Sequence, residues 1–219
     1  KFSNGLFSCA KKYKVDLIGG DTSKGPLSIS ISILGEVLKK NTLLRSNALI
    51  EDDIWVTGEL GLAALGLAKL QKKIQLPQNL SKKAIRALEK PMLHSSIIQS
   101  MARLSHSAID ISDGLIADLG HILKASKVGA DISLKEIPMN SWLTKNKLFD
   151  VGLSGGDDYQ LLFTAPKKNQ NKINLMNKIS SIKITRIGSI KKNKHLNIID
   201  HKGMPYKIKK RGYDHFEAK

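Results

Sequence analysis

The hydrophobic period changes abruptly within residues 107–123, and this change limits what the chain can fold into. Ile109 and Ile111 alternate with small or polar residues, which is typical of a strand with one buried face. After residue 113 the apolar positions take the spacing of an amphipathic helix: Leu115, Ile116, Leu119, Ile122 and Leu123. A strand that leads straight into a helix predicts a mixed fold in which helices pack on a sheet.

Three polar side chains stand at this junction, namely Asp110, Ser112 and Asp113. Ser112 or Asp113 can cap the helix by accepting a backbone N–H. Capping does not account for Asp110, because a carboxylate on a buried strand loses hydration unless a partner compensates it. No basic residue adjoins Asp110 in the sequence, so a divalent cation is a candidate partner.

Two further acidic clusters follow paired glycines. GGDTS places Asp21 after two glycines, and SGGDDY does the same for Asp157 and Asp158. Each is an ordinary turn when taken alone. Together with residues 110–113 they indicate a site for phosphate and Mg²⁺, because glycines let backbone N–H groups approach an anion and carboxylates bind hard cations. The sequence has no P-loop motif.

The other patterns predict strands and helices mixed along the chain. Strands are expected at 13–20, 26–37, 53–61 (with a turn), 181–190 and 195–200, the last two as arms of a hairpin around KKNK. Helices are expected at 60–73, 82–89 and 92–104, and a polar helix after residue 165. The fold class is therefore α/β, with mixed α+β character, and the polar stretch 39–52 is the predicted domain boundary.

The formal net charge of +17 raises the alternative of a basic nucleic-acid-binding module. Its lysines are spread over many turns and element ends, and aromatic residues for stacking on bases are only 5% of the chain, so we expect no nucleic-acid partner. No apolar run approaches the ~18 residues of a membrane span, which predicts no membrane partner. The single Cys9 cannot form an internal disulfide, and the expected location is the cytoplasm.

Five ordered motifs carry a resemblance that runs from about residue 5 to Phe216: LIGGDTSKGPLSISISILG, DDIWVTGELGLAALGLA, AIDISDGLIADLGHILKAS, LSGGDDYQLLFTAP and GYDHF. They resemble the thiamine-monophosphate kinase family of the aminoimidazole ribonucleotide synthetase-like superfamily. The resemblance implies that ATP phosphorylates thiamine phosphate to thiamine diphosphate, with several Mg²⁺ ions and a homodimer. It also implies that residues 1–48 are the C-terminal part of an N-terminal domain and 49–219 a C-terminal α/β domain. The family's upstream segment is missing, so the chain alone is expected to be inactive.

The resemblance also assigns roles to single residues. It implies that ATP is bound by Gly20, Asp21, Arg45 and Ser112, Mg²⁺ by Asp21, Asp110 and Asp113, and thiamine phosphate by Asp157 and Tyr213. No residue is expected to act as a covalent nucleophile, because the attacking atom is a phosphate oxygen.

The chain departs from the family pattern in two places. Asp157 and Gln160 stand where the family usually has Glu, and Ile50-Glu51-Asp52 replaces Pro-Gly-Asp. Another ATP-dependent enzyme of the same superfamily is the alternative function.

Overall fold

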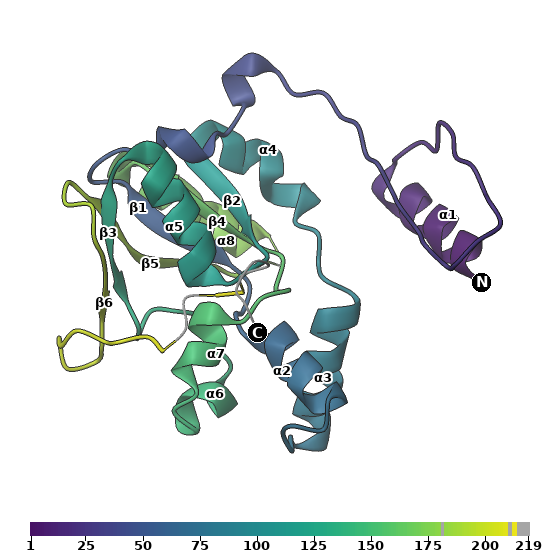
Figure 1. The fold of residues 1–219 in the computed structure, drawn as a ribbon. Helices are drawn as coiled ribbons and strands as arrows, with labels where there is room; N and C mark the ends of the chain where they lie inside the picture. The colour runs from purple at the N-terminus through teal and green to yellow at the C-terminus, as the bar shows by residue number, and fades with distance from the viewer. Residues whose placement is uncertain (181, 210–211, 214–219) are drawn as a thin grey trace. The chain divides into compact units, whose positions relative to one another are not determined.

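The computed structural model of the chain describes residues 1–180, 182–209 and 212–213 (Figure 1). These residues form two compact units, 1–36 and 37–219. The domain division predicted from the sequence, 1–48 and 49–219, stays a prediction.

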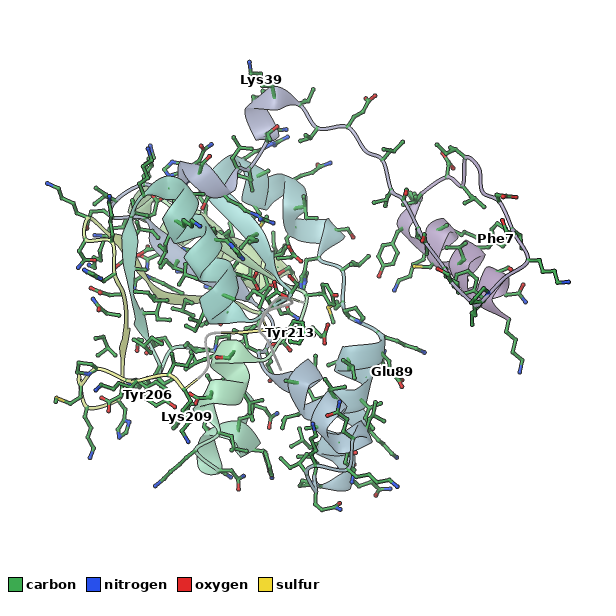
Figure 2. The ribbon with its side chains drawn as sticks, viewed as in Figure 1. Phe7, Lys39, Glu89, Tyr206, Lys209 and Tyr213 are labelled. Carbon is green, nitrogen blue, oxygen red and sulfur yellow. The ribbon has the colours of Figure 1, made fainter. Side chains whose placement is uncertain are left out.

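The first unit contains one helix, α1 (Phe2–Tyr13), and residues 14–38 are neither helix nor strand. The strands predicted at 13–20 and 26–37 are therefore wrong. A strand requires a hydrogen-bonded neighbour, and the described residues provide none for this segment. Its alternating apolar side chains are exposed; Ile31 and Ile33, for example, are 66% and 75% exposed. Phe7 is also exposed on α1 (Figure 2).

The second unit is built on a six-stranded sheet with the order β2-β4-β1-β5-β3-β6. Neighbouring strands are antiparallel, except that β3 and β6 are parallel. The strands are β1 (Asp53–Thr57), β2 (Ser107–Ile111), β3 (Gly129–Ser133), β4 (Gln160–Ala165), β5 (Ile184–Lys191) and β6 (Leu196–Ile199).

Helices follow or separate these strands: α2 (Leu62–Leu70), α3 (Gln78–Glu89), α4 (Ser95–Leu104), α5 (Leu115–Ser126), α6 (Ser141–Lys145), α7 (Phe149–Ser154) and α8 (Gln170–Ile179). Short 3₁₀ turns lie at Lys39–Asn41, Arg45–Asn47 and Lys167–Asn169. Among the described residues, no helix combines the length and the apolar character that crossing a bilayer requires.

The sheet has an apolar core on each face. On one face the sheet is covered by α5 (Figure 1). Leu119 and Ile122 of α5 belong to the same buried apolar cluster as Ile54 of β1. On the other face, α4 and α8 pack against Trp55 and Phe163, whose rings stack with centroids 6.4 Å apart. This arrangement of helices on a mixed sheet confirms the predicted fold class, including the strand-to-helix junction at residues 107–123.

The predicted hairpin around KKNK is wrong. Strands β5 and β6 both form, but β3 lies between them and pairs with each. The sequence analysis did not predict β3, whose Ala130 and Ile132 are fully buried or nearly so. An interior position in the sheet buries these two side chains and satisfies the backbone of β3 on both edges, which an edge position would not do.

Candidate functional site

The loop between β2 and α5 carries the polar residues that the sequence analysis singled out. Asp110 is exposed on β2, so it retains its hydration and the desolvation argument made for it does not apply. Ser112 and Asp113 are half-buried at the turn. Gly114, with φ +116°, begins α5, and a Cβ there would collide with the backbone of Ser154. The turn therefore needs glycine to bring the loop against the end of α7.

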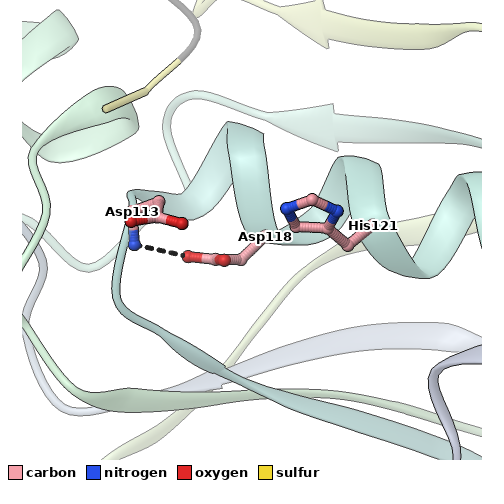
Figure 3. A group of neighbouring side chains, drawn as sticks. All are labelled: Asp113, Asp118 and His121. Carbon is pink, nitrogen blue, oxygen red and sulfur yellow. Dashed lines mark hydrogen bonds between the residues drawn. The ribbon is translucent and has the colours of Figure 1, made fainter. Parts of the chain in front are cut away.

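Asp118 holds this loop in place. Its Oδ2 accepts hydrogen bonds from the backbone N–H groups of Ser112 (3.0 Å), Asp113 (3.1 Å) and Gly114 (3.2 Å), and Figure 3 shows the bond from Asp113. The residue that precedes α5 is Gly114, which has no side chain with which to cap the helix. Burial raises the pKa of Asp118, and the nearby carboxylates of Asp113 and Asp110 raise it further.

Asp113, Asp118 and His121 place their possible metal-binding atoms within 4.8 Å of one another (Figure 3). The acidic motifs of the sequence did not mark Asp118 or His121. The signal for Asp118 was its position in the first turn of an amphipathic helix, where a carboxylate can accept the free N–H groups. His121 follows Asp118 at i+3 on the same helix, so the two side chains are neighbours.

The glycine-rich loop before β4 packs against the end of β2. The backbone N–H of Asp157 donates to the Ser112 carbonyl over 2.8 Å, and that of Tyr159 donates to the Ile111 carbonyl over 2.8 Å. Gly156 lies so close to the Ser112 carbonyl that a Cβ would not fit. Asp157 and Tyr159 have left-handed backbones, with φ of +66° and +48°. Asp157, the predicted substrate contact, thus lies beside the predicted ATP contact Ser112.

Asp158 points away from this surface and is buried. Its carboxylate accepts hydrogen bonds from the N–H groups of Gly61 (2.6 Å) and Ala63 (3.2 Å), at the start of α2. Burial raises its pKa to about 6, although these bonds favour the ionised form. Asp158 is therefore an anchor of the loop, a role that the sequence analysis did not assign.

The second unit also contains Arg45 and Tyr213. Arg45 is exposed and lines a cavity of about 540 Å³ together with Asp110. The backbone N–H of Tyr213 donates to the Asp113 carbonyl over 3.0 Å, and the residue is 59% exposed. The structure thus brings Arg45 and Tyr213 close to the 110–113 loop, which contains Ser112. The last three residues of the GYDHF motif, 214–216, lie outside the described residues.

Gly20 and Asp21 lie in the first unit and are exposed. The Asp21 carboxylate accepts a hydrogen bond from the Ser23 hydroxyl over 3.4 Å. Residues 15–20, which precede Asp21, form no strand. The prediction that Asp21 lies directly after a strand is therefore wrong.

Residues 50–201 match the family model of the AIR synthase related protein, C-terminal domain. The thiamine-monophosphate kinase of Buchnera aphidicola subsp. Schizaphis graminum is 46% identical over 98% of this chain, which spans 68% of that protein. The crystal structure of thiamine-monophosphate kinase from Stenotrophomonas maltophilia K279a is 33% identical, with a TM-score of 0.82 over 90% of this chain and 65% of that one. A structure of AaThiL complexed with AMPPCP and TMP is 27% identical, with a TM-score of 0.66 over 80% of this chain and 54% of that one.

Proposed function

Because this chain belongs to the thiamine-monophosphate kinase family, we infer that it serves the ATP-dependent phosphorylation of thiamine phosphate to thiamine diphosphate. The enzyme is a phosphotransferase whose acceptor is itself a phosphate group. The structural relative that was solved with AMPPCP and TMP supports this pair of substrates.

One observation in the chain itself carries the proposal. Within the second unit, segments to which the family pattern assigns nucleotide, metal and substrate meet at the end of β2, where the Asp157 N–H donates to the Ser112 carbonyl and the Tyr213 N–H donates to the Asp113 carbonyl. A reaction between two anionic phosphates depends on bringing them together and neutralising their charge. Residues proposed to bind ATP and thiamine phosphate on the same loop surface would bring the two phosphates together.

We propose that Asp110 and Asp113 hold Mg²⁺ at this surface. For Asp21, which lies in the first unit, the family pattern alone supports a role as a Mg²⁺ ligand. The donors fit a hard cation: Asp110 is an exposed carboxylate, and together with Asp113 it creates a negative field that already raises the pKa of Asp118. Bound Mg²⁺ supplies neutralisation of phosphate charge. Asp118 acts by fixing the backbone of the loop.

The other residues position the two substrates. We propose that Arg45 binds ATP phosphate oxygens through its guanidinium, since it shares a cavity with Asp110. The family pattern also supports ATP contacts by Ser112 and, in the first unit, by Gly20. Asp157 faces the cationic part of thiamine phosphate, and the Tyr213 ring lies against it. The attacking phosphate oxygen is already ionised at neutral pH, so these residues bind and orient, and none is needed as a nucleophile.

We also propose a homodimer and a cytoplasmic location. Exposed apolar side chains of residues 26–37, such as Ile31 and Ile33, supply surface for a partner. A lone cysteine and the use of ATP both suit the cytoplasm.

The test is ADP release by the protein that carries this chain, measured with ATP, Mg²⁺ and thiamine phosphate. We expect turnover with thiamine phosphate, a product that comigrates with thiamine diphosphate, and no turnover with formylglycinamidine ribonucleotide. Turnover with the ribonucleotide alone would overturn the assignment and favour another enzyme of the superfamily.

A further inference from the structure

Three polar side chains form a hydrogen-bonded chain at the start of β4. Gln160 Oε1 accepts hydrogen bonds from the Thr57 hydroxyl (2.9 Å) and from His94 Nε2 (2.7 Å). Thr57 Oγ1 in turn accepts the backbone N–H of Leu161 (2.8 Å). Thr57 and His94 are buried, and Gln160 is half-buried. The chain connects the end of β1, the start of β4 and the residue before α4.

The pattern assigns every proton. An amide oxygen only accepts, so both Thr57 and His94 must donate to Gln160. The Thr57 hydroxyl donates its one proton to Gln160 and accepts the Leu161 N–H with a lone pair. His94 therefore carries its proton on Nε2, and its Nδ1 is a buried atom with no hydrogen-bond partner among the described residues. Burial also lowers the pKa of His94, so the imidazole is neutral at neutral pH.

The backbone leaves space for this arrangement. Gly58, which follows Thr57, has φ +63°, and a Cβ there would collide with the side-chain oxygen of Gln160. Glycine at this position thus admits both the left-handed turn and the Gln160 side chain.

The residue before Gln160 belongs to the strained part of the glycine-rich loop. Asp157 and Tyr159 both have left-handed backbones, a conformation that non-glycine residues keep only when their surroundings impose it. The loop is fixed by backbone bonds to β2 and by Asp158 at α2. Gln160 fixes its last residue to β1 and to His94.

We propose that Thr57, Gln160 and His94 are positioning residues that hold the glycine-rich loop so that Asp157 faces thiamine phosphate. The proposal rests on the proposed function, because Asp157 must contact the substrate for its position to matter. The three side chains act through the start of β4: without them, Tyr159 and Asp157 relax from their left-handed conformations, and the Asp157 carboxylate moves away from its contact.

Thr57→Val removes the hydroxyl while keeping the side-chain shape. We expect the KM for thiamine phosphate to rise about tenfold, which is the ~1.4 kcal/mol of one net hydrogen bond, with the KM for ATP unchanged. Thr57→Ser keeps the hydroxyl and should restore the KM. The matched control is Thr164→Val, which removes a hydroxyl equally buried at the other end of β4, where it bonds to Ser107 and Asp52. The control should lower the melting temperature and leave both KM values unchanged.

A double-mutant cycle separates this proposal from the proposed function. If Asp157→Asn raises the KM for thiamine phosphate, Thr57→Val should add no further increase in that background. An additive increase, or an unchanged KM in Thr57→Val, overturns the positioning role alone. An unchanged KM in Asp157→Asn overturns the substrate contact on which both depend. Gln160→Met, which has no acceptor of similar strength, provides the same comparison if Thr57→Val does not fold.

A measurement without substrate tests the geometry directly. The ¹⁵N chemical shifts of the His94 ring in the 219-residue chain should show a protonated Nε2 and an unprotonated Nδ1 at neutral pH. The opposite tautomer would contradict the hydrogen-bonded chain and the proposal built on it.

Discussion

Asp118 accepts the backbone N–H of Asp113 over 3.1 Å, so one carboxylate fixes the position of another that we propose binds Mg²⁺. The same oxygen also accepts the N–H groups of Ser112 and Gly114. Three convergent N–H groups offset part of the cost of burying this carboxylate so near two others. The loop is thereby shaped before any ligand binds, which reduces the entropy that ligand binding must overcome.

Asp118→Ala should lower the free energy of unfolding by about 1–3 kcal/mol, because it removes the acceptor of three N–H groups at a partly buried turn. Asp118→Asn keeps one carbonyl acceptor and should lose less. Urea denaturation of both variants measures the difference. His121→Ala is the control: it removes an exposed neighbour from the same cluster, and we expect a change within about 0.5 kcal/mol. Equal stability of Asp118→Ala and the native chain would contradict the anchoring role.

Asp158 gives the stability a defined pH dependence. Burial raises its pKa to about 6 in the folded chain, whereas the ordinary aspartate pKa of 3.8 applies in the unfolded chain. Between about pH 4 and pH 6 the folded state therefore binds more protons than the unfolded state at this group. The contribution of Asp158 to the free energy of unfolding thus falls as the pH rises through this window, by on the order of 3 kcal/mol.

Asp158→Asn removes this titration. The difference in unfolding free energy between Asp158→Asn and the native chain should change between pH 4 and pH 6, in favour of the variant as the pH rises, and level off above about pH 7. Urea denaturation at several pH values measures it. A difference that does not vary with pH would show that folding leaves the pKa of Asp158 unchanged.

Much of the sheet could be predicted from local patterns, because those strands and helices bury their own apolar residues. The change of period between Ile111 and Leu115 defined β2 and α5 within a few residues. Strand β3 was missed because GADIS is short and holds few apolar residues, and its place in the sheet depends on β5 and β6. Alternation at 26–37 predicted a strand, but alternation does not supply the neighbour that a strand needs.

The site was predictable in part. The strand-to-helix junction marked Asp113 and a glycine pair marked Asp157, and the structure brings their loops together through Ser112. The anchoring roles of Asp118 and Asp158 were missed because they depend on N–H groups that only the folded backbone directs at them, in the case of Asp158 from Gly61 far along the chain. For Asp158, sequence spacing contains no signal of such a contact, whereas for Asp118 its position in the first turn of α5 was one.

Asp110→Asn should separate function from stability. Asp110 is exposed, so the substitution should change the free energy of unfolding by less than about 0.5 kcal/mol. As a metal ligand it should matter greatly: turnover should fall on the order of 10²-fold, equivalent to ~3 kcal/mol of lost transition-state stabilisation. Excess Mg²⁺ should recover part of the loss. Asp21→Asn should reduce turnover in the same way. If either variant turns over as fast as the native enzyme at limiting Mg²⁺, the substituted residue is not a metal ligand.

At position 157 the chain has Asp, where the family pattern usually has Glu. The backbone conformation at this position accounts for the shorter residue. At φ +66° Asp is better tolerated than Glu, because its short side chain suits the left-handed region. Asp157→Asn keeps this tolerance and removes the charge. The KM for thiamine phosphate should therefore rise by the equivalent of ~1.5–3 kcal/mol, with the KM for ATP unchanged.

Asp157→Glu tests reach against backbone strain. The longer side chain can still contact the cationic part of thiamine phosphate, so we expect the KM to stay near that of the native enzyme, while the melting temperature falls slightly because Glu is less suited to this backbone. Asp200→Asn is the charge control, since it removes a half-buried carboxylate that accepts the N–H groups of Lys202 and Met204 within its own turn. If Asp157→Asn and Asp200→Asn change the KM for thiamine phosphate equally, the effect comes from net charge, and Asp157 makes no specific contact with the substrate.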